Sequence, residues 1–118
     1  MLSLELPTWG SQISGFAAVV TPNGASAYYS GTGAGAVVTG SVTCNPMGGT
    51  PPYTYSWING IGDPEILATN NNSQSTTFYA APPPSTFSYV AYYYCQVTDS
   101  TMATANSNLI PVEIDRNT

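Results

Sequence analysis

The feature that most constrains this chain is the spacing of its two cysteines, one tryptophan and one tyrosine. Cys44 and Cys95 have Trp57 between them, and Tyr93 stands two residues before the second cysteine. In an extended chain the side chains alternate between two sides, so Tyr93 and Cys95 lie on the same side of one strand. We therefore expect an all-β chain in which Tyr93 and Cys95 face the core from one strand.

Composition and turn residues support this expectation. Short alternating runs recur with turn residues between them, and no helical periodicity extends over a full window. Glycine occurs 11 times and proline 10 times in the 118 residues, which favours many turns and few helices. A chain of this length suits one domain with a single core.

The alternation of apolar and polar residues predicts which side chains face the core. The expected inward residues are Val38, Val42 and Cys44 in residues 36–45, Tyr53, Tyr55 and Trp57 in residues 53–57, and Ala91, Tyr93, Cys95 and Val97 in residues 89–98. In the strand expected for residues 75–79, Thr77 and Tyr79 lie on the side opposite to Phe78. The same alternation turns Tyr92, Tyr94 and Gln96 outward.

The remaining segments are predicted more coarsely. A first strand is expected in residues 13–20 and a last one in residues 102–114, with an interruption near Pro111. Three further segments are expected outside the sheets: an exposed connection in residues 63–72, a corner at the prolines of residues 82–84, and a loose tail in residues 115–118.

The run from Gly49 to Trp57 is similar to the start of repeats in bacterial surface proteins of the polycystic-kidney-disease-like and immunoglobulin-like groups. The cysteine pair favours the immunoglobulin-like group, whose signature combines two cysteines, a tryptophan between them and a tyrosine two residues before the second cysteine. The resemblance covers roughly residues 36–114.

The resemblance implies an immunoglobulin-like sandwich of two antiparallel sheets. In such a domain a disulfide would join Cys44 to Cys95, Trp57 would pack against it, and the Tyr93 hydroxyl would bond to backbone near Phe87 or Ser88. Two packed thiols, as in a reducing cytosol, are the alternative to the disulfide. Residues 36–118 would form the sandwich, and residues 1–35 an N-terminal arm or extra strands.

Charge excludes some classes of partner. Only 6% of the residues are charged, lysine and histidine are absent, Arg116 is the one cation, and the net charge is −5. Nucleic acids and anionic membranes attract clustered lysine and arginine, so we expect neither as a partner. No apolar stretch has the length needed to cross a bilayer, and residues 1–9 do not resemble a secretory signal.

The inventory of reactive side chains is poor. Without histidine, no side chain has an ordinary pKa suited to general-base work near neutrality, and neither cysteine has a histidine partner. The acidic pairs Asp63 with Glu65 and Glu113 with Asp115 are interpreted as solvated acids. A calcium site from Asp63, Glu65 and the carbonyls of residues 70–72 is a weak alternative. We expect no enzyme activity, no cofactor and no metal.

Surface recognition remains, and tyrosines are its candidates. Tyrosine offers a large rigid face and a polar tip, and it is enriched at interfaces. Tyr92 and Tyr94 are expected to be outward partner-binding residues, with Tyr28 and Tyr29 as further candidates. Exposed, they would contact a neighbouring subunit or stack on sugar rings. Alternatively, the N-terminal segment covers them.

Small immunoglobulin-like proteins are familiar in tailed bacteriophage virions, and the resemblance therefore implies a structural accessory protein of a head, tail or neck. Its partners would be other virion proteins in an oligomeric assembly, with weak adhesion to cell-surface glycans as a further role, and it would be located in the virion. The alternative is a carbohydrate-binding or adhesion module of a secreted bacterial surface protein, outside the cell or on its surface.

Overall fold

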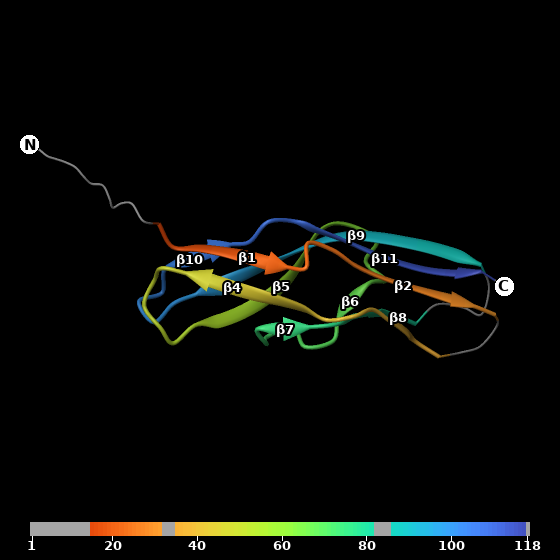
Figure 1. Ribbon diagram of the computed structural model, residues 1–118, viewed down its shortest axis with the longest axis horizontal. Coiled ribbons are helices and arrows are strands. Elements are labelled where there is room, and N and C mark those ends of the chain that lie inside the picture. The colour runs from red at the N-terminus through yellow and green to blue at the C-terminus, as the bar shows by residue number, and fades with distance from the viewer. Residues whose placement is uncertain (1–14, 32–34, 82–85, 118) are drawn as a thin grey trace, which may run out of the picture.

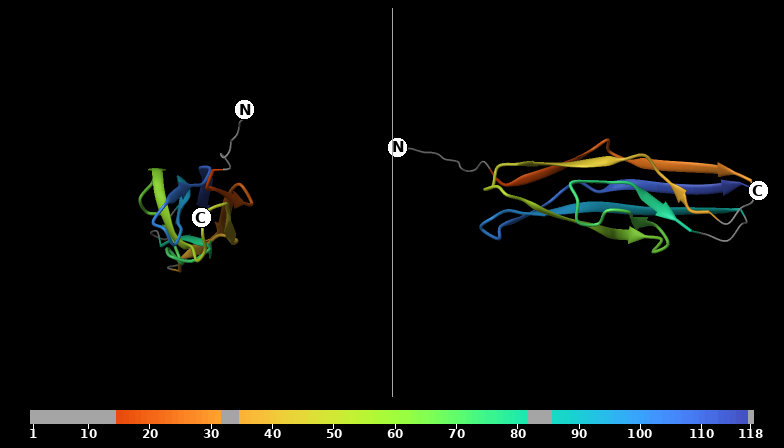
Figure 2. Two further views of the ribbon diagram at one scale, coloured as in Figure 1. Left: turned by 90° about the vertical axis from the view of Figure 1, so that its left-hand side faces the viewer. Right: turned by 90° about the horizontal axis from the view of Figure 1, so that it is seen from below.

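The protein is all-β in the part that the structure describes. The computed structural model describes residues 15–31, 35–81 and 86–117 (Figure 1). Within these ranges the chain forms eleven strands and no helix, so it contains no helix there that could span a membrane. Seen end-on in the left view of Figure 2, the strands surround a common interior, as in a β-sandwich. The all-β prediction is confirmed.

One layer is made of two short antiparallel sheets that follow each other along the chain. The strands are β1 (Ala17–Thr21), β4 (Val42–Met47) and β7 (Ser75–Thr76) in the first sheet, and β3 (Val37–Val38), β8 (Phe78–Ala80) and β6 (Leu67–Ala68) in the second. β3 continues into β4, and β7 continues into β8, so the pairings β3 with β8 and β4 with β7 form one interrupted ladder.

The other layer is organised around one long strand, β9. Its strands are β10 (Thr104–Asn106), β9 (Phe87–Thr98), β11 (Ile110–Asn117), β2 (Ala25–Ser30) and β5 (Thr54–Gly62). β5 pairs with one edge of β9, whereas β10 and β11 pair with the other edge. β2 closes the sheet beside β11, in parallel orientation. The break between β10 and β11 lies in residues 107–109, just before Pro111, where the sequence predicts an interruption.

Three aromatic rings fill the space between the layers. The Phe78 ring meets the Trp57 ring edge-on, with centroids 6.0 Å apart, and the Tyr93 ring at 4.7 Å. Trp57 is only 3% exposed, and its Nε1–H donates to the Ser73 carbonyl oxygen at 2.7 Å. Edge-to-face contacts of this kind add to the stabilisation that burial alone provides.

The expected inward positions of β9 are confirmed, because Ala91, Tyr93, Cys95 and Val97 are all buried.

The inward position expected for Val38 is wrong. Val38 is 53% exposed, whereas Val37 and Thr39 on either side of it are buried. The alternation changes between β3 and β4, where the Thr39 Oγ1 donates to the Gly40 carbonyl oxygen at 2.7 Å and accepts from the Phe78 N–H at 3.0 Å. A side chain that bonds to nearby backbone in this way competes with the regular strand ladder.

The connection of residues 63–72 is not simply exposed. It contains β6, and Ile66 just before that strand is fully buried. Asp63 begins the connection: its N–H donates to the Val90 carbonyl oxygen at 2.9 Å, and its carboxylate accepts from the Val90 N–H at 2.9 Å. This pair of bonds directs the chain back toward the core, where Ile66 packs.

The loose tail expected for residues 115–118 is also wrong for the part described. β11 extends to Asn117, and Arg116 is only 2% exposed. The tail is ordered because it pairs with β9 on one side and with β2 on the other, up to Asn117 opposite Ser30.

The N-terminal third contributes strands in its described part. β1 pairs with β4 in one layer, and β2 pairs with β11 in the other. The first strand begins at Ala17. Residues 13 and 14 of the expected first strand lie outside the described residues, and so do residues 1–12 and the proline corner of residues 82–84.

A single carboxylate organises one end of the sandwich. The Asp99 Oδ1 accepts from the N–H and the hydroxyl of Thr101 at 2.9 and 2.8 Å and from the Ala103 N–H at 3.0 Å. Its Oδ2 accepts from the Thr50 N–H at 2.9 Å, which ties the turn before β10 to the turn before β5. The hydrogen bond from the Thr101 side chain, followed by those from backbone, lowers the pKa of Asp99 below its ordinary value.

Replacing the central indole should strongly destabilise the fold. Removal of a large buried aromatic side chain leaves a cavity, and we expect Trp57→Ala to lower the free energy of unfolding by about 3 to 5 kcal/mol. Urea denaturation measures this change. Trp57→Phe, which keeps a ring but loses the bond to Ser73, should lie between the wild type and the alanine variant. A loss below about 1 kcal/mol for Trp57→Ala would mean that the indole does not join the layers.

Asp99 should make stability fall in acid. Because its pKa is lower in the folded state than in the unfolded chain, its ionised form stabilises the fold above the ordinary aspartate pKa of about 3.9. This contribution is lost as the pH falls through the folded-state pKa. We expect Asp99→Asn to unfold at a lower temperature at neutral pH and to show a smaller decrease between about pH 5 and pH 3. Melting curves at several pH values check this, and identical slopes in both proteins would contradict it.

Candidate functional site

The expected disulfide is not present. Cys44 and Cys95 are free thiols, and both are fully buried. Their side chains are in hydrogen-bond contact, and Cys95 is the residue opposite Trp57 in the β5–β9 ladder. The hydrogen bond with Cys44 and burial raise the pKa of the Cys95 thiol. Packed thiols behave as small apolar side chains, so the core is closed here by packing and not by a covalent bond.

Tyr93 is a core residue, but its hydrogen bond differs from the expected one. Its hydroxyl donates to the Ile66 carbonyl oxygen at 2.6 Å and not to backbone near Phe87 or Ser88. The bond connects β9 to the connection that precedes β6. Tyr93 therefore holds a connection against the core from within the sandwich. Burial raises the pKa of its hydroxyl, which keeps this donor protonated.

The outward tyrosines of β9 lie where the alternation predicts. Tyr92 is 41% exposed and Tyr94 is half-buried, both on the outer face of the β5–β9–β11 sheet. The alternative in which the N-terminal segment covers Tyr92 finds no support in the described residues, since β1 belongs to the opposite layer and β2 pairs beyond β11. Tyr94 is partly covered by its sheet neighbours.

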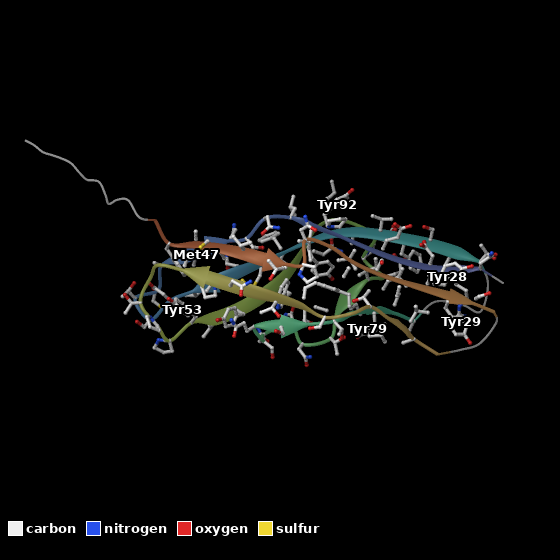
Figure 3. The ribbon with its side chains drawn as sticks, in the orientation of Figure 1. Tyr28, Tyr29, Met47, Tyr53, Tyr79 and Tyr92 are labelled. Atoms are coloured by element: carbon white, nitrogen blue, oxygen red, sulfur yellow. The ribbon has the colours of Figure 1, made fainter. Side chains whose placement is uncertain are left out.

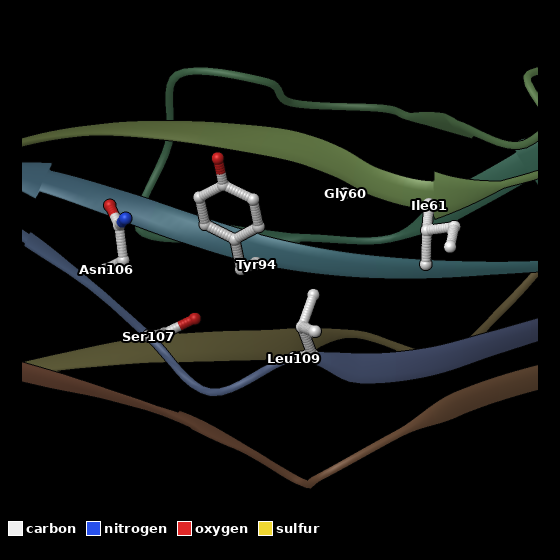
Figure 4. Close-up of a pocket in the computed structure, with 6 residues that line it drawn as sticks. All are labelled: Gly60, Ile61, Tyr94, Asn106, Ser107 and Leu109. Carbon is white, nitrogen blue, oxygen red and sulfur yellow. The ribbon is translucent and has the colours of Figure 1, made fainter.

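A groove of about 530 Å³ opens beside Tyr94 (Figure 4). Its lining comes from three strands and the loop after β10: Gly60, Ile61, Tyr94, Asn106, Ser107 and Leu109. Figure 4 shows the Tyr94 ring between Asn106 on one side and Leu109 and Ile61 on the other. Ile61 and Leu109 are 67% and 55% exposed, so the groove has an open apolar margin.

The groove depends on an irregularity in β5. The pairing register of β5 with β9 shifts between Asn59 and Ile61, so Gly60 forms a bulge. A Cβ at Gly60 would stand 3.1 Å from the Leu109 Cδ2 and 3.3 Å from the Tyr92 carbonyl oxygen. Glycine therefore leaves open the space between Leu109 and the neighbouring tyrosines.

Two polar groups of the groove are available for a ligand. The Ser107 Oγ is already used, since it accepts from the Cys95 N–H at 2.9 Å and donates to the Asn108 carbonyl oxygen at 2.9 Å. The Asn106 Oδ1 accepts from the Gln96 Nε2 at 3.3 Å. Within the described part of the chain, the Asn106 Nδ2 and the Tyr94 hydroxyl have no hydrogen-bond partner.

Tyr28 and Tyr29 lie at the other end of the same sheet (Figure 3). They are 63% and 44% exposed. Beneath them the Arg116 guanidinium carbon stands 5.0 Å from the centroid of the Tyr29 ring and 5.8 Å from that of Phe87, and its Nη2 donates to the Gly35 carbonyl oxygen at 3.2 Å. Cation–π contacts of this kind favour a buried guanidinium. The structure does not bring these tyrosines together with Tyr92 and Tyr94.

The acidic pairs do not form a metal site in the described residues, where no three acidic, histidine or cysteine side chains are grouped for one. The Asp63 carboxylate already accepts from Val90, and the carbonyl oxygens of Asn70 and Asn71 accept from Ser73 and Trp57. Three oxygens of the calcium alternative, Asp63 Oδ2 and the carbonyls of Asn70 and Asn71, thus already accept hydrogen bonds within the protein.

The pair Glu113 and Asp115 is on the outer face of β11. The hydrogen bond with Asp115 and the repulsion between the two charges raise the pKa of Glu113. Glu113 also borders a shallow hollow of about 290 Å³ beside Gly24 and Pro111. Because Glu113 is exposed, solvent screens this repulsion.

No protein-family model matches the chain, and no curated protein matches it. Function therefore has to be inferred from the fold and the surface.

Sequence reasoning identified Tyr94 but missed the rest of the groove. Gly60 carried a signal, since an isolated glycine inside an alternating strand is typical of a bulge. Asn106 and Leu109 carried none, because only the pairing of β10 and β11 with β9 brings them to Tyr94.

The two cysteines should react only in the unfolded protein. Because both are fully buried, we expect Ellman's reagent to detect no thiol in the native chain and two in urea without reductant. Cys44→Ala, in which one thiol remains, is the control. If the unfolded, unreduced wild type shows no thiol, a disulfide has formed, and the packed-thiol core would be wrong.

Proposed function

We propose that this chain is a non-enzymatic immunoglobulin-like domain that serves as a structural accessory protein of a bacteriophage virion. The strand pairing supports the immunoglobulin-like assignment. One layer pairs β1 with β4 and β4 with β7, and the other places β5, β9, β11 and β2 side by side. The buried Trp57, Cys44 and Cys95 occupy the middle of this arrangement, as in the sandwich signature.

The observation that carries the structural role is the number of large apolar side chains left exposed on the described surface. They are Val19, Tyr28, Tyr29, Val38, Met47, Ile61, Leu67, Tyr92, Met102 and Leu109. Val38 and Leu67 both stand opposite Tyr79 in the β3–β8–β6 sheet, so Val38, Tyr79 and Leu67 form one row across that sheet. Exposed apolar surface that is contiguous favours contacts with other proteins.

The charge distribution supports neutral partners. The one cation of the sequence, Arg116, is buried, so the described surface presents acids, amides, hydroxyls and aromatic rings. Such a surface has nothing to neutralise the phosphates of a nucleic acid. It suits packing against virion subunits in an oligomeric assembly, with location in the virion.

The alternative function is a carbohydrate-binding or adhesion module of a secreted bacterial surface protein. The groove beside Tyr94 favours it, because an aromatic ring with nearby hydrogen-bonding groups is a recognition surface that packing in a particle does not require. In that case the domain would act at the cell surface or outside the cell.

Sedimentation of particles distinguishes the two functions. If the chain is a virion component, an antibody against it should detect it in gradient fractions that contain the particles of the virus encoding it. The major capsid subunit is the positive control, and a phage-encoded enzyme that is not packaged is the negative control. A chain that stays with the free proteins at the top of the gradient would contradict the virion role.

A further inference from the structure

We propose that the groove between Tyr94 and Leu109 binds a neutral sugar ring of a glycan. This inference rests on the proposed function in treating the chain as a non-enzymatic domain. It is compatible with a virion protein that adheres weakly to cell-surface glycans and with an adhesion module of a surface protein. It assigns a site and a ligand class to one face of the sheet.

The groove combines the two surfaces that a sugar ring requires. A pyranose has apolar C–H faces and a rim of hydroxyls, so it matches an aromatic ring with hydrogen-bonding groups beside it. Tyr94 provides the ring, and its hydroxyl and the Asn106 Nδ2 are the polar groups left unused within the described residues. Ile61 and Leu109 add apolar contact at the margin.

Charge selects the class of sugar. None of the six residues that line the groove is an aspartate, glutamate, lysine, arginine or histidine. The chain has a net charge of −5 and its one cation is buried beneath Tyr29, at the other end of the sheet. Sialic and uronic acids would therefore meet repulsion without a compensating cation, whereas neutral hexoses and N-acetylhexosamines would not.

The groove is also held in place before a ligand arrives. The Asn106 side chain is fixed by Gln96, and the backbone of Ser107 is tied to Cys95 by its N–H, which donates to the Cys95 carbonyl oxygen at 2.9 Å. The Gly60 bulge belongs to the β5–β9 ladder. Little ordering is needed on binding, which helps a small ligand with few contacts. A volume of about 530 Å³ falls in the range of small-molecule sites.

Chemical-shift titration of the folded chain tests the proposal. Glucose, galactose and N-acetylglucosamine are the neutral probes, and glucuronic acid and N-acetylneuraminic acid are the acidic ones. We expect saturable shifts in residues 58–61, 94 and 106–109 with at least one neutral probe, and at least about tenfold weaker binding of both acids.

Variants assign the binding to the groove. Tyr94→Ala and Asn106→Ala should each weaken binding, the tyrosine variant by about tenfold, as for other aromatic anchors. Ser88→Ala is the control, because Ser88 is an exposed residue at the far end of β9 with no assigned role, and this variant should bind as the wild type does. Melting curves show whether each variant is folded, and Asn106→Ala, which removes an exposed side chain, keeps the test valid if Tyr94→Ala unfolds.

The outcomes separate this inference from the proposed function. No saturable shift with any neutral probe, or equal losses in Tyr94→Ala and Ser88→Ala, would overturn the sugar site even if the chain sediments with particles. Tighter binding of the acidic probes would overturn the neutral ligand class. Sugar binding by a chain that never sediments with particles would leave the site standing and contradict the virion role alone.

Discussion

The contact of Phe78 with Trp57 and Tyr93 is the interaction on which the rest of the structure depends. Phe78 comes from one layer, and the two partner rings come from β5 and β9 of the other. Because these rings must face the interior, the alternation of a strand fixes the direction of every neighbour. With Tyr93 and Cys95 inward on β9, Tyr92 and Tyr94 have to point outward. The outward direction of Tyr92 and Tyr94 is thus a consequence of the core.

Local departures from regular pairing give the molecule its specific features. The bulge at Gly60 opens the groove beside Tyr94, and the break at residues 39–41 turns Val38 to the surface. Gly60 alone falls outside its ladder, and residues 39–41 fall outside theirs; beyond each break the side chains change faces. Bulges are common next to binding sites because they redirect side chains while the sheet stays rigid.

The surface follows from how few charges the sequence has and where the fold puts them. The Arg116 guanidinium lies against the Tyr29 and Phe87 rings, and the Asp99 carboxylate connects two turns through hydrogen bonds. What remains outside is dominated by uncharged polar and aromatic side chains, and contacts with such a surface rely on shape, stacking and hydrogen bonds. Both the assembly role and the sugar site that we propose use this property.

The sequence by itself determined the all-β class, the inward and outward sides of β9, and the burial of Cys44, Trp57, Tyr93 and Cys95. These depend on alternation within single strands, which is a local property. Only the tertiary structure decided the free state of the thiols, the bond from Tyr93 to Ile66, the ordered end of β11 and the residues that meet Tyr94 in the groove. Each of these depends on which distant strands become neighbours and in what register, and no pattern within one segment contains that information.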